Sequence, residues 1–333
     1  MKFRGMLKIA VPIFLGSAVA SPAQPERPIA LELPLACRVG ENCFIQQYFD
    51  HDPGPGAKDY RCGPMTYEGH DGTDLRVPTM AEQQKGVDVL AAAAGVVRGV
   101  RDGMEDVNVR IAGLASVKGR ECGNGVVIAH TGGWETQYCH MAKGSVRVKS
   151  GQSVPAGTVL GQVGMSGEAE FPHLHLSVRH NKEKIDPFAP DSKAGACGGG
   201  DPLWSKSAAM ALAYHSPDVV NAGFAGAPIT MDDVESGRAA SAAPAADSPN
   251  MIAYVRPIGL KEGDVQIMTV RGPEGVLARS ERPPLDSNKA QSLLYIGKKR
   301  TAGSWPRGSY EALYEVKREK VTVLIRRFNF DLR

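Results

Sequence analysis

The sequence predicts an all-β protein built from two β-rich parts, and three observations support this. A chain of 333 residues exceeds what one ordinary core organises, which favours two domains. From about residue 61 to residue 190, short segments that are rich in Val and Ile, or that alternate apolar with polar residues, recur between Gly-rich turns. A second set of such segments follows residue 250. The composition, 42% hydrophobic and 23% charged, is typical of folded proteins and argues against wholesale disorder.

The predicted strands fall into these two sets. The clearest strands of the first set are Ala94–Arg101, Gly125–His130, Glu135–Met141 and His173–Val178. The turn Thr131–Trp134 joins the second and third of them into a hairpin. The second set contains Met251–Val255, Asp264–Val270, Gln291–Ile296, Tyr310–Val316 and Val321–Phe328. Regular spacing of short strands in this set indicates a small immunoglobulin-like β-sandwich.

Residues 1–20 have the pattern of a signal peptide. Lys2, Arg4 and Lys8 form a basic start, Ile9–Leu15 is apolar, and residues 18–20 supply a small-x-small cleavage site. The apolar run is shorter than the roughly 20 residues that a membrane span needs, so we expect cleavage and no stable membrane span. The sequence therefore predicts an exported protein.

The rest of the chain divides by composition and charge. We expect an extended segment over 21–60, a first β-rich domain over 61–200, a linker with a possible short helix over 201–250, and an accessory sandwich over 251–333. Within the linker, the Ser-, Ala- and Pro-rich stretch 235–250 is predicted to be flexible. Residues 21–250 carry 20 Lys and Arg against 27 acids, whereas residues 251–333 carry 16 against 9. The basic second part favours an anionic polymer as a partner, and we expect no nucleic-acid partner.

All six cysteines lie before residue 200, and their even number in an exported chain favours disulfides over a thiolate metal site. Six cysteines allow many pairings, and the sequence does not choose among them. Cys37 and Cys43 are close in the sequence, and Cys122 and Cys139 flank the predicted hairpin. Bridges within these two pairs are plausible, and they would leave Cys62 with Cys197.

The histidines carry the chemistry. His70 and Asp74 lie in a turn-rich segment, His140 ends a predicted strand, and His173 and His175 share another. Residues i and i+2 of a strand project to the same side, so His173 and His175 face together. Two imidazoles and a carboxylate that converge from separate strands form a three-ligand zinc site with an open fourth position, as catalytic zinc requires. Asp71, next to His70, is expected to point elsewhere and is left out of this set.

These motifs, in this order, resemble the lysostaphin-type (LytM-like) zinc endopeptidases of bacterial peptidoglycan. The resemblance covers roughly residues 61–190 and includes the glycine turn Gly164–Gly167, while Glu168–Phe171 departs from the family pattern by being longer and more acidic. It implies a lysostaphin-type β-sandwich, which is a duplicated hybrid motif or barrel-sandwich hybrid. It also implies one Zn²⁺ per chain and the following residue roles. The zinc ligands would be His70, Asp74 and His175, and the catalytic histidines beside the metal would be His140 and His173.

The predicted function is therefore a zinc metalloendopeptidase that acts in the periplasm or outside a bacterial cell. Its partners would be peptidoglycan peptides, whose peptide bonds it would hydrolyse through a zinc-activated water. The alternative is a catalytically silent family member that binds and regulates a cell-wall hydrolase. Such a member would be expected to lack metal ligands, and all three are present here.

Overall fold

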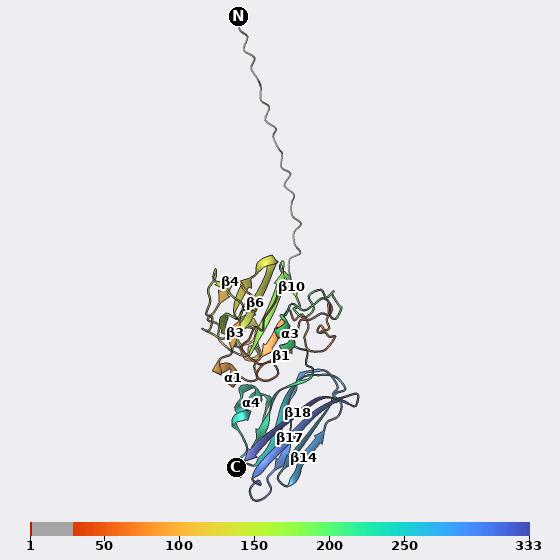
Figure 1. Ribbon diagram of the computed structural model, residues 1–333. Coiled ribbons are helices and arrows are strands. Elements are labelled where there is room, and N and C mark those ends of the chain that lie inside the picture. Colours follow the sequence, from red (N-terminus) through yellow and green to blue (C-terminus); the bar gives the residue numbers. More distant parts are fainter. Residues whose placement is uncertain (2–28) are drawn as a thin grey trace.

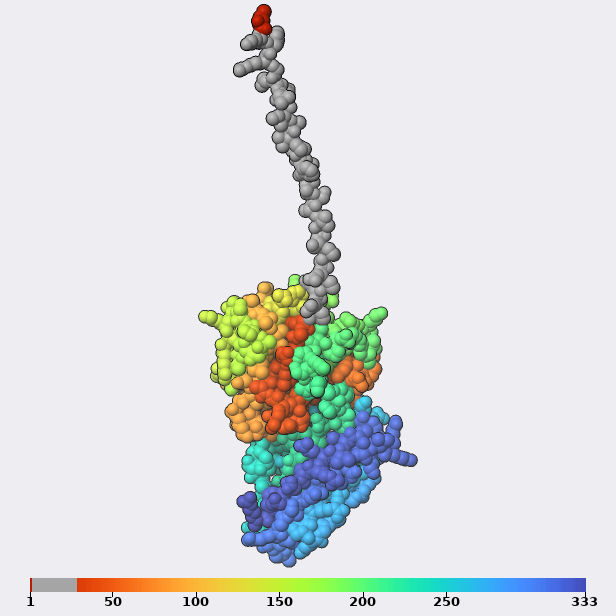
Figure 2. Space-filling model, in the orientation of Figure 1, coloured from red at the N-terminus to blue at the C-terminus, as the bar shows by residue number. Residues whose placement is uncertain are grey.

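The computed structural model describes Met1 and residues 29–333, which form two β-rich bodies stacked along one axis (Figure 1). The predicted signal peptide and residues 21–28 of the predicted extended segment lie outside this described part, apart from Met1. In the space-filling view the two bodies are in contact (Figure 2). Among residues 29–333, no helix has the length and apolar character that a membrane crossing requires.

The first body is organised by one antiparallel sheet of eight strands. Along the sheet, the order is β1 (Phe44–Gln47), β2 (Thr73–Arg76), β9 (His173–His180), β6 (Trp134–Met141), β5 (Asn124–Ala129), β4 (Gly95–Arg101) and β7 (Ser153–Val154), and β10 (Glu183–Ile185) pairs with β9. A two-stranded sheet is formed by β3 (Asp88–Leu90) and β8 (Val159–Gln162). The four predicted strands of this part are confirmed as β4, β5, β6 and β9, and β5 and β6 pair as the predicted hairpin.

Helices in the first body are short, as its Gly-rich sequence predicts. They are α1 (Met80–Lys85), α2 (Val109–Ala112), and the 3₁₀ turns η1 (Leu114–Ser116) and η2 (Thr131–Gly133). The apolar sides of the strands meet in a single core that includes Val126, Ile128, Tyr138, Leu174 and Leu176, each fully buried. This core holds β2, β6 and β9 rigidly next to one another.

The segment 21–60, predicted to be extended and separate from the catalytic domain, is part of the first body where it is described. Leu31 pairs with Trp204, Leu35 pairs with Val89, and β1 forms the edge of the large sheet beside β2. Leu31, Leu35 and Phe44 are buried in the core. These apolar residues are spaced among Pro and Gly, so their burial depends on distant partners that a local pattern does not reveal.

The second body is a β-sandwich of two four-stranded sheets. One contains β11 (Asp218–Ala225), β12 (Asn250–Leu260), β15 (Lys289–Gln291) and β16 (Leu294–Lys299). The other has the order β14 (Gly275–Glu281), β13 (Val265–Gly272), β17 (Gly308–Arg318) and β18 (Val321–Leu332). Four of the five strands predicted after residue 250 are present, whereas the predicted strand Gln291–Ile296 is divided between β15 and β16. The inner faces bury Met251, Met268 and Tyr314. The immunoglobulin-like type of this sandwich stays a prediction.

The stretch 201–250 differs from the predicted linker. It contains one short helix, α3 (Lys206–Ala211), but also β11, which pairs along β12, and the helices α4 (Met231–Ser236) and α5 (Arg238–Ser241). A capping box between Thr230 and Asp233 begins α4, and Val234 and Ala239 are buried against Tyr254. Residues 235–241, predicted as the start of a flexible stretch, are therefore ordered, because their small apolar residues pack against the second body.

Three disulfides close the first body: Cys37–Cys43, Cys62–Cys197 and Cys122–Cys139. These are the three pairs that the sequence analysis gave as plausible. Cys122 lies two residues before β5, and its disulfide links it to Cys139 near the end of β6. The backbone N–H of the next residue, His140, donates to the Cys122 carbonyl at 2.8 Å. The bridge therefore fixes the end of β6 on which His140 lies.

Candidate metal centre

The pairing of β2 with β9 brings together residues that are distant in the sequence. Asp74 on β2 lies directly opposite His175 on β9, and His70 precedes them in the turn that leads into β2. Asp74 Oδ1 is 2.9 Å from His175 Nδ1 and 3.2 Å from His70 Nε2, and the two nitrogens are 3.2 Å apart. The side chains of His70 and Asp74 are almost fully buried, and that of His175 is 12% exposed. Three donor atoms thus converge on one point from two elements.

Hydrogen bonds determine which nitrogen of each imidazole is free. His70 Nδ1 lies 2.6 Å from the carbonyl oxygen of Tyr48, so Nδ1 carries the proton and Nε2 presents its lone pair. His175 Nε2 lies 3.1 Å from Asp71 Oδ1 and its Nδ1 lies 2.9 Å from Asp74 Oδ1, so a metal ion bound at Nδ1 would leave Nε2–H to donate to Asp71. Both nitrogens therefore face the oxygen of Asp74, which is the arrangement that a metal ion needs.

Asp71 is the site residue that the sequence analysis missed. It was assigned to the opposite side because neighbouring residues of a strand alternate, but β2 begins only at Thr73. Residues 70–72 precede the strand, so alternation does not apply to them, and the Asp71 carboxylate contacts His175 Nε2. Its other oxygen pairs with Lys184 on β10. A carboxylate that holds a ligating histidine in its tautomer is a common support of metal sites.

Replacing Asp71 with Asn should weaken zinc binding by about 10- to 100-fold, because the carboxylate that orients His175 and increases its basicity is lost. The measurement is the zinc dissociation constant, obtained by competition with a chelator. Glu183→Gln is the matched control, since Glu183 lies on β10 beside Lys184, is exposed, and forms no ion pair within the described residues. Equal zinc affinities in Asp71→Asn and the wild type would contradict this support role.

His140 and His173 lie beside the three converging atoms without joining them. His140 stands at the end of β6 with a left-handed backbone (φ 61°), and its Nδ1 donates to the Ser166 carbonyl at 2.8 Å. His173 Nδ1 donates to the Phe171 carbonyl at 2.8 Å. The two rings are 4.6 Å apart, and His173 Nε2 is 3.6 Å from Asp74 Oδ1. Each therefore presents an unprotonated Nε2 next to the centre.

The protonation of His140, His173 and His175 follows from burial and charge. Burial lowers the pKa of His140 well below its usual value, and His173 and His175 lower it further. Burial likewise lowers the pKa of His173. Burial also acts to lower the pKa of His175, but hydrogen bonds to Asp71 and Asp74 outweigh it and raise the pKa to about 9. Near neutral pH, His140 and His173 are thus neutral bases, whereas His175 attracts a cation, either a proton or a metal ion.

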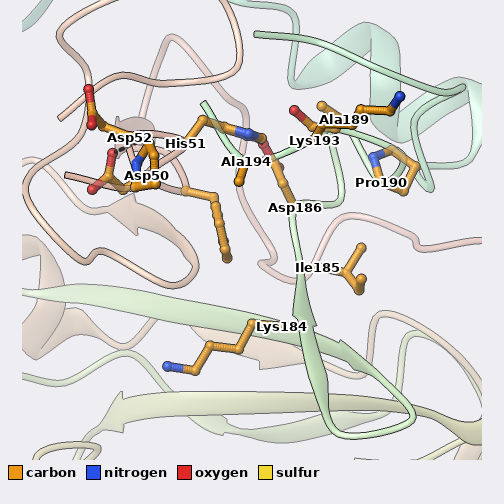
Figure 3. A pocket seen from close by; sticks show the side chains of 13 residues that line it. Asp50, His51, Asp52, Lys184, Ile185, Asp186, Ala189, Pro190, Lys193 and Ala194 are labelled. Carbon is orange, nitrogen blue, oxygen red and sulfur yellow. Dashed lines mark hydrogen bonds and ion pairs between the residues drawn. The ribbon is translucent and has the colours of Figure 1, made fainter. Parts of the chain in front are cut away.

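A cavity of about 240 Å³ is lined by residues 49–53 and by side chains between 184 and 194 (Figure 3). In its wall, His51 points to Asp186, with Nε2 and Oδ2 2.7 Å apart. The carboxylate of Asp50 accepts from the backbone N–H of Gly69, and the backbone N–H of Asp50 donates to the His70 carbonyl at 2.8 Å. Asp186 is therefore hydrogen-bonded to His51, and Asp50 is hydrogen-bonded to the loop that contains Gly69 and His70.

The donor set fits zinc. Two imidazole nitrogens and one carboxylate oxygen are ligands that Zn²⁺ prefers, and three protein ligands are typical of catalytic zinc sites, which keep a further position open. Burial keeps the pKa of His140 low. Burial would raise the pKa of the Asp74 carboxyl, but the surrounding imidazoles outweigh it and hold that pKa well below its usual value. A divalent cation that displaces the proton of His175 would therefore meet one negative charge and two imidazole nitrogens.

A buried His–Asp–His centre with two further histidines, set on an antiparallel sheet, is a candidate zinc site of the catalytic type. Residues 68–187 match the model of peptidase family M23 and include all five of these residues. This region of the chain is a peptidase family M23 domain, as the lysostaphin-type resemblance predicts. The family consists generally of zinc metallopeptidases.

Among curated proteins, the chain is similar to the DD-carboxypeptidase/endopeptidase Mpg of Neisseria meningitidis serogroup B. They are 31% identical over 134 residues, which is 39% of this chain and 25% of that protein. It is also 39% identical over 71 residues to the cell division protein DipM of Caulobacter vibrioides, which is 20% of this chain and 11% of that protein. The chain thus spans a quarter or less of the length of these relatives.

Solved structures with a similar fold include a zinc-containing peptidase from Vibrio cholerae, which is 25% identical with a TM-score of 0.33. That similarity covers 48% of this chain and 39% of the other. The catalytic domain of lysostaphin from Staphylococcus simulans is 21% identical with a TM-score of 0.28, and the similarity covers 43% of this chain and 86% of that domain.

Proposed function

We propose that the chain is an exported zinc metalloendopeptidase that hydrolyses peptide bonds of bacterial cell-wall peptidoglycan. The observation that carries this proposal is the complete His70–Asp74–His175 donor set, in which His70 Nε2 and His175 Nδ1 both face Asp74 Oδ1. The substrate class is supported by the M23 family and by the relatives Mpg and DipM. Export to the periplasm or the outside of the cell is supported by the three disulfides.

The residues suggest how hydrolysis would proceed. Zn²⁺ held by the three donor atoms would supply a Lewis acid that makes a water molecule nucleophilic near neutral pH. His140 and His173 have lowered pKa values, and the Nδ1 proton of each is engaged by a backbone carbonyl. Each Nε2 can therefore accept a proton from water and return it to the leaving amine. A protonated Nε2 can also donate to the oxyanion that forms at the scissile carbonyl.

The alternative function is a catalytically silent protein that binds and regulates a wall hydrolase. A member that had lost catalysis would not be expected to keep both the metal ligands and the neutral histidines beside them. The deciding experiment is metal analysis of the purified mature protein, combined with release of soluble peptides from isolated cell walls. One zinc per chain together with peptide release supports the enzyme, whereas zinc binding without release supports the regulator.

We further propose that the basic second body binds an anionic polymer of the wall. Lys298 and Lys299 at the end of β16 are exposed and form no ion pair among the described residues, whereas the neighbouring Arg300 is occupied by backbone carbonyls. Free surface lysines of this kind attract anions over roughly a Debye length, about 8 Å at physiological salt.

Reversing both charges with Lys298→Glu/Lys299→Glu should therefore reduce the fraction of full-length protein that pellets with cell walls at low salt. In the wild type, that fraction should decrease steeply as salt increases, because screening shortens the attraction. Lys118→Glu/Lys206→Glu changes the net charge equally at exposed positions of the first body and is the matched control. Pelleting that is unaffected by both double variants and by salt would eliminate an electrostatic partner.

A further inference from the structure

Arg76, two residues after Asp74 on β2, is fully buried and reaches out of the first body into the second. Its Nη2 lies 2.8 and 3.0 Å from the two carboxylate oxygens of Glu235 on α4, and its Nη1 donates to Gln46 at 2.8 Å. This charge-assisted ion pair joins residues that are 159 positions apart. Figure 1 labels α4 at the junction between the two bodies.

The same carboxylate is shared with a second buried guanidinium. Arg256 on β12, also fully buried, pairs with Glu235 and donates its Nη2 to the Pro78 carbonyl of the first body. Two guanidinium groups are thus held against one carboxylate away from solvent. Removing that carboxylate would leave two buried like charges uncompensated, so the arrangement depends on Glu235 more than on any other member.

Arg76 also touches the wall of the active site. Its Cζ stands 4.4 Å from the centre of the Phe171 ring, in cation–π contact, and that ring is 4.7 Å from the ring of His173. The Phe171 carbonyl is the acceptor that fixes the Nδ1 proton of His173 at 2.8 Å. In the β2–β9 pairing, Arg76 is moreover directly opposite His173. A displacement of the Arg76 guanidinium would therefore be transmitted to the orientation of His173.

We propose that Glu235 is a positioning residue through which the second body orients His173 in the active site. The chain of contacts runs from Glu235 to Arg76, from Arg76 to the Phe171 ring, and from the Phe171 carbonyl to His173. The importance of this orientation for turnover rests on the proposed function, in which His173 transfers protons. The orientation itself does not depend on that function and can be measured separately.

The experiment compares the zinc-loaded full chain with Glu235→Gln and Arg76→Gln, which remove the ion pair from its two sides. Asp232→Asn is the matched control, because Asp232 lies on the same helix and is exposed. Three quantities are measured at a temperature at which the wild type and every variant are folded. They are the zinc content, kcat and KM for peptide release, and the ¹H–¹⁵N signal of the His173 Nδ1–H. That signal is assigned by its absence in His173→Gln.

Both ion-pair variants should keep their zinc, because none of the three ligands is touched, and should lower kcat by about 10- to 100-fold with little change in KM. The His173 Nδ1–H signal should shift and exchange faster with water, whereas the control should match the wild type. If the variants only melt earlier, with kcat and the His173 signal unchanged, Glu235 is a structural residue and the proposal is wrong. If the wild type releases no peptide, the proposed function is wrong, but the His173 signal still decides whether Glu235 positions this histidine.

Discussion

Replacing His175 with alanine is expected to remove both the bound zinc and the activity, whereas replacing His140 with alanine should remove most of the activity alone. His175 Nδ1 is one of three donor atoms within 3.2 Å of one another, so its loss leaves too few ligands. His140 donates Nδ1–H to Ser166 and only faces the centre, so its loss should lower kcat by about 10²- to 10⁴-fold, the usual contribution of a general acid or base.

The measurements are zinc content after dialysis and the rate of peptide release from cell walls. His215→Ala is the control for histidine removal in general, since His215 is exposed and lies outside the centre. If His140→Ala lost its zinc while remaining folded, His140 would be a ligand and the division of roles would have to be reversed.

Much of this centre could be predicted from the sequence, because the motifs are local and their strands alternate regularly. His173 and His175 lie on β9, a strand that the pattern identifies, and both approach Asp74 as alternation requires. Asp71 was missed because it lies before β2 begins, where side-chain direction does not follow strand alternation. The acceptors of the imidazole protons, such as the Tyr48 carbonyl, are backbone groups. Every residue has such a group, so the sequence does not show which one will lie next to a histidine.

The second body was predicted less completely, for a different physical reason. Its strands after residue 250 alternate clearly, but β11 and α4 lie within 201–250, which was predicted as a linker, and α5 lies in the Ser-, Ala- and Pro-rich end of that stretch. Their order comes from burial against Tyr254 and from the pairing of Glu235 with Arg76 and Arg256. Such long-range contacts leave no periodic signal, so composition alone indicated a flexible linker.

Breaking the disulfide Cys62–Cys197 with Cys62→Ser/Cys197→Ser is expected to lower the free energy of unfolding by about 4–5 kcal/mol. The two cysteines are 135 positions apart, so the bridge removes much of the entropy of the unfolded chain. Cys37→Ser/Cys43→Ser opens a loop with a separation of only 6 residues and should cost about 2 kcal/mol. The matched pair therefore isolates the effect of loop length from the effect of the substitution itself.

Urea denaturation of the three proteins, followed by tryptophan fluorescence, measures both costs, because Trp204 is buried in the core of the first body. Thiol titration of the denatured, unreduced wild type should find no free sulfhydryl, since all six cysteines are paired. Equal losses of stability in the two double variants would mean that the long bridge acts through local packing near Cys62 instead of through the unfolded chain. Six free thiols in the wild type would instead show that the bridges do not form, and that the first body is held by its core alone.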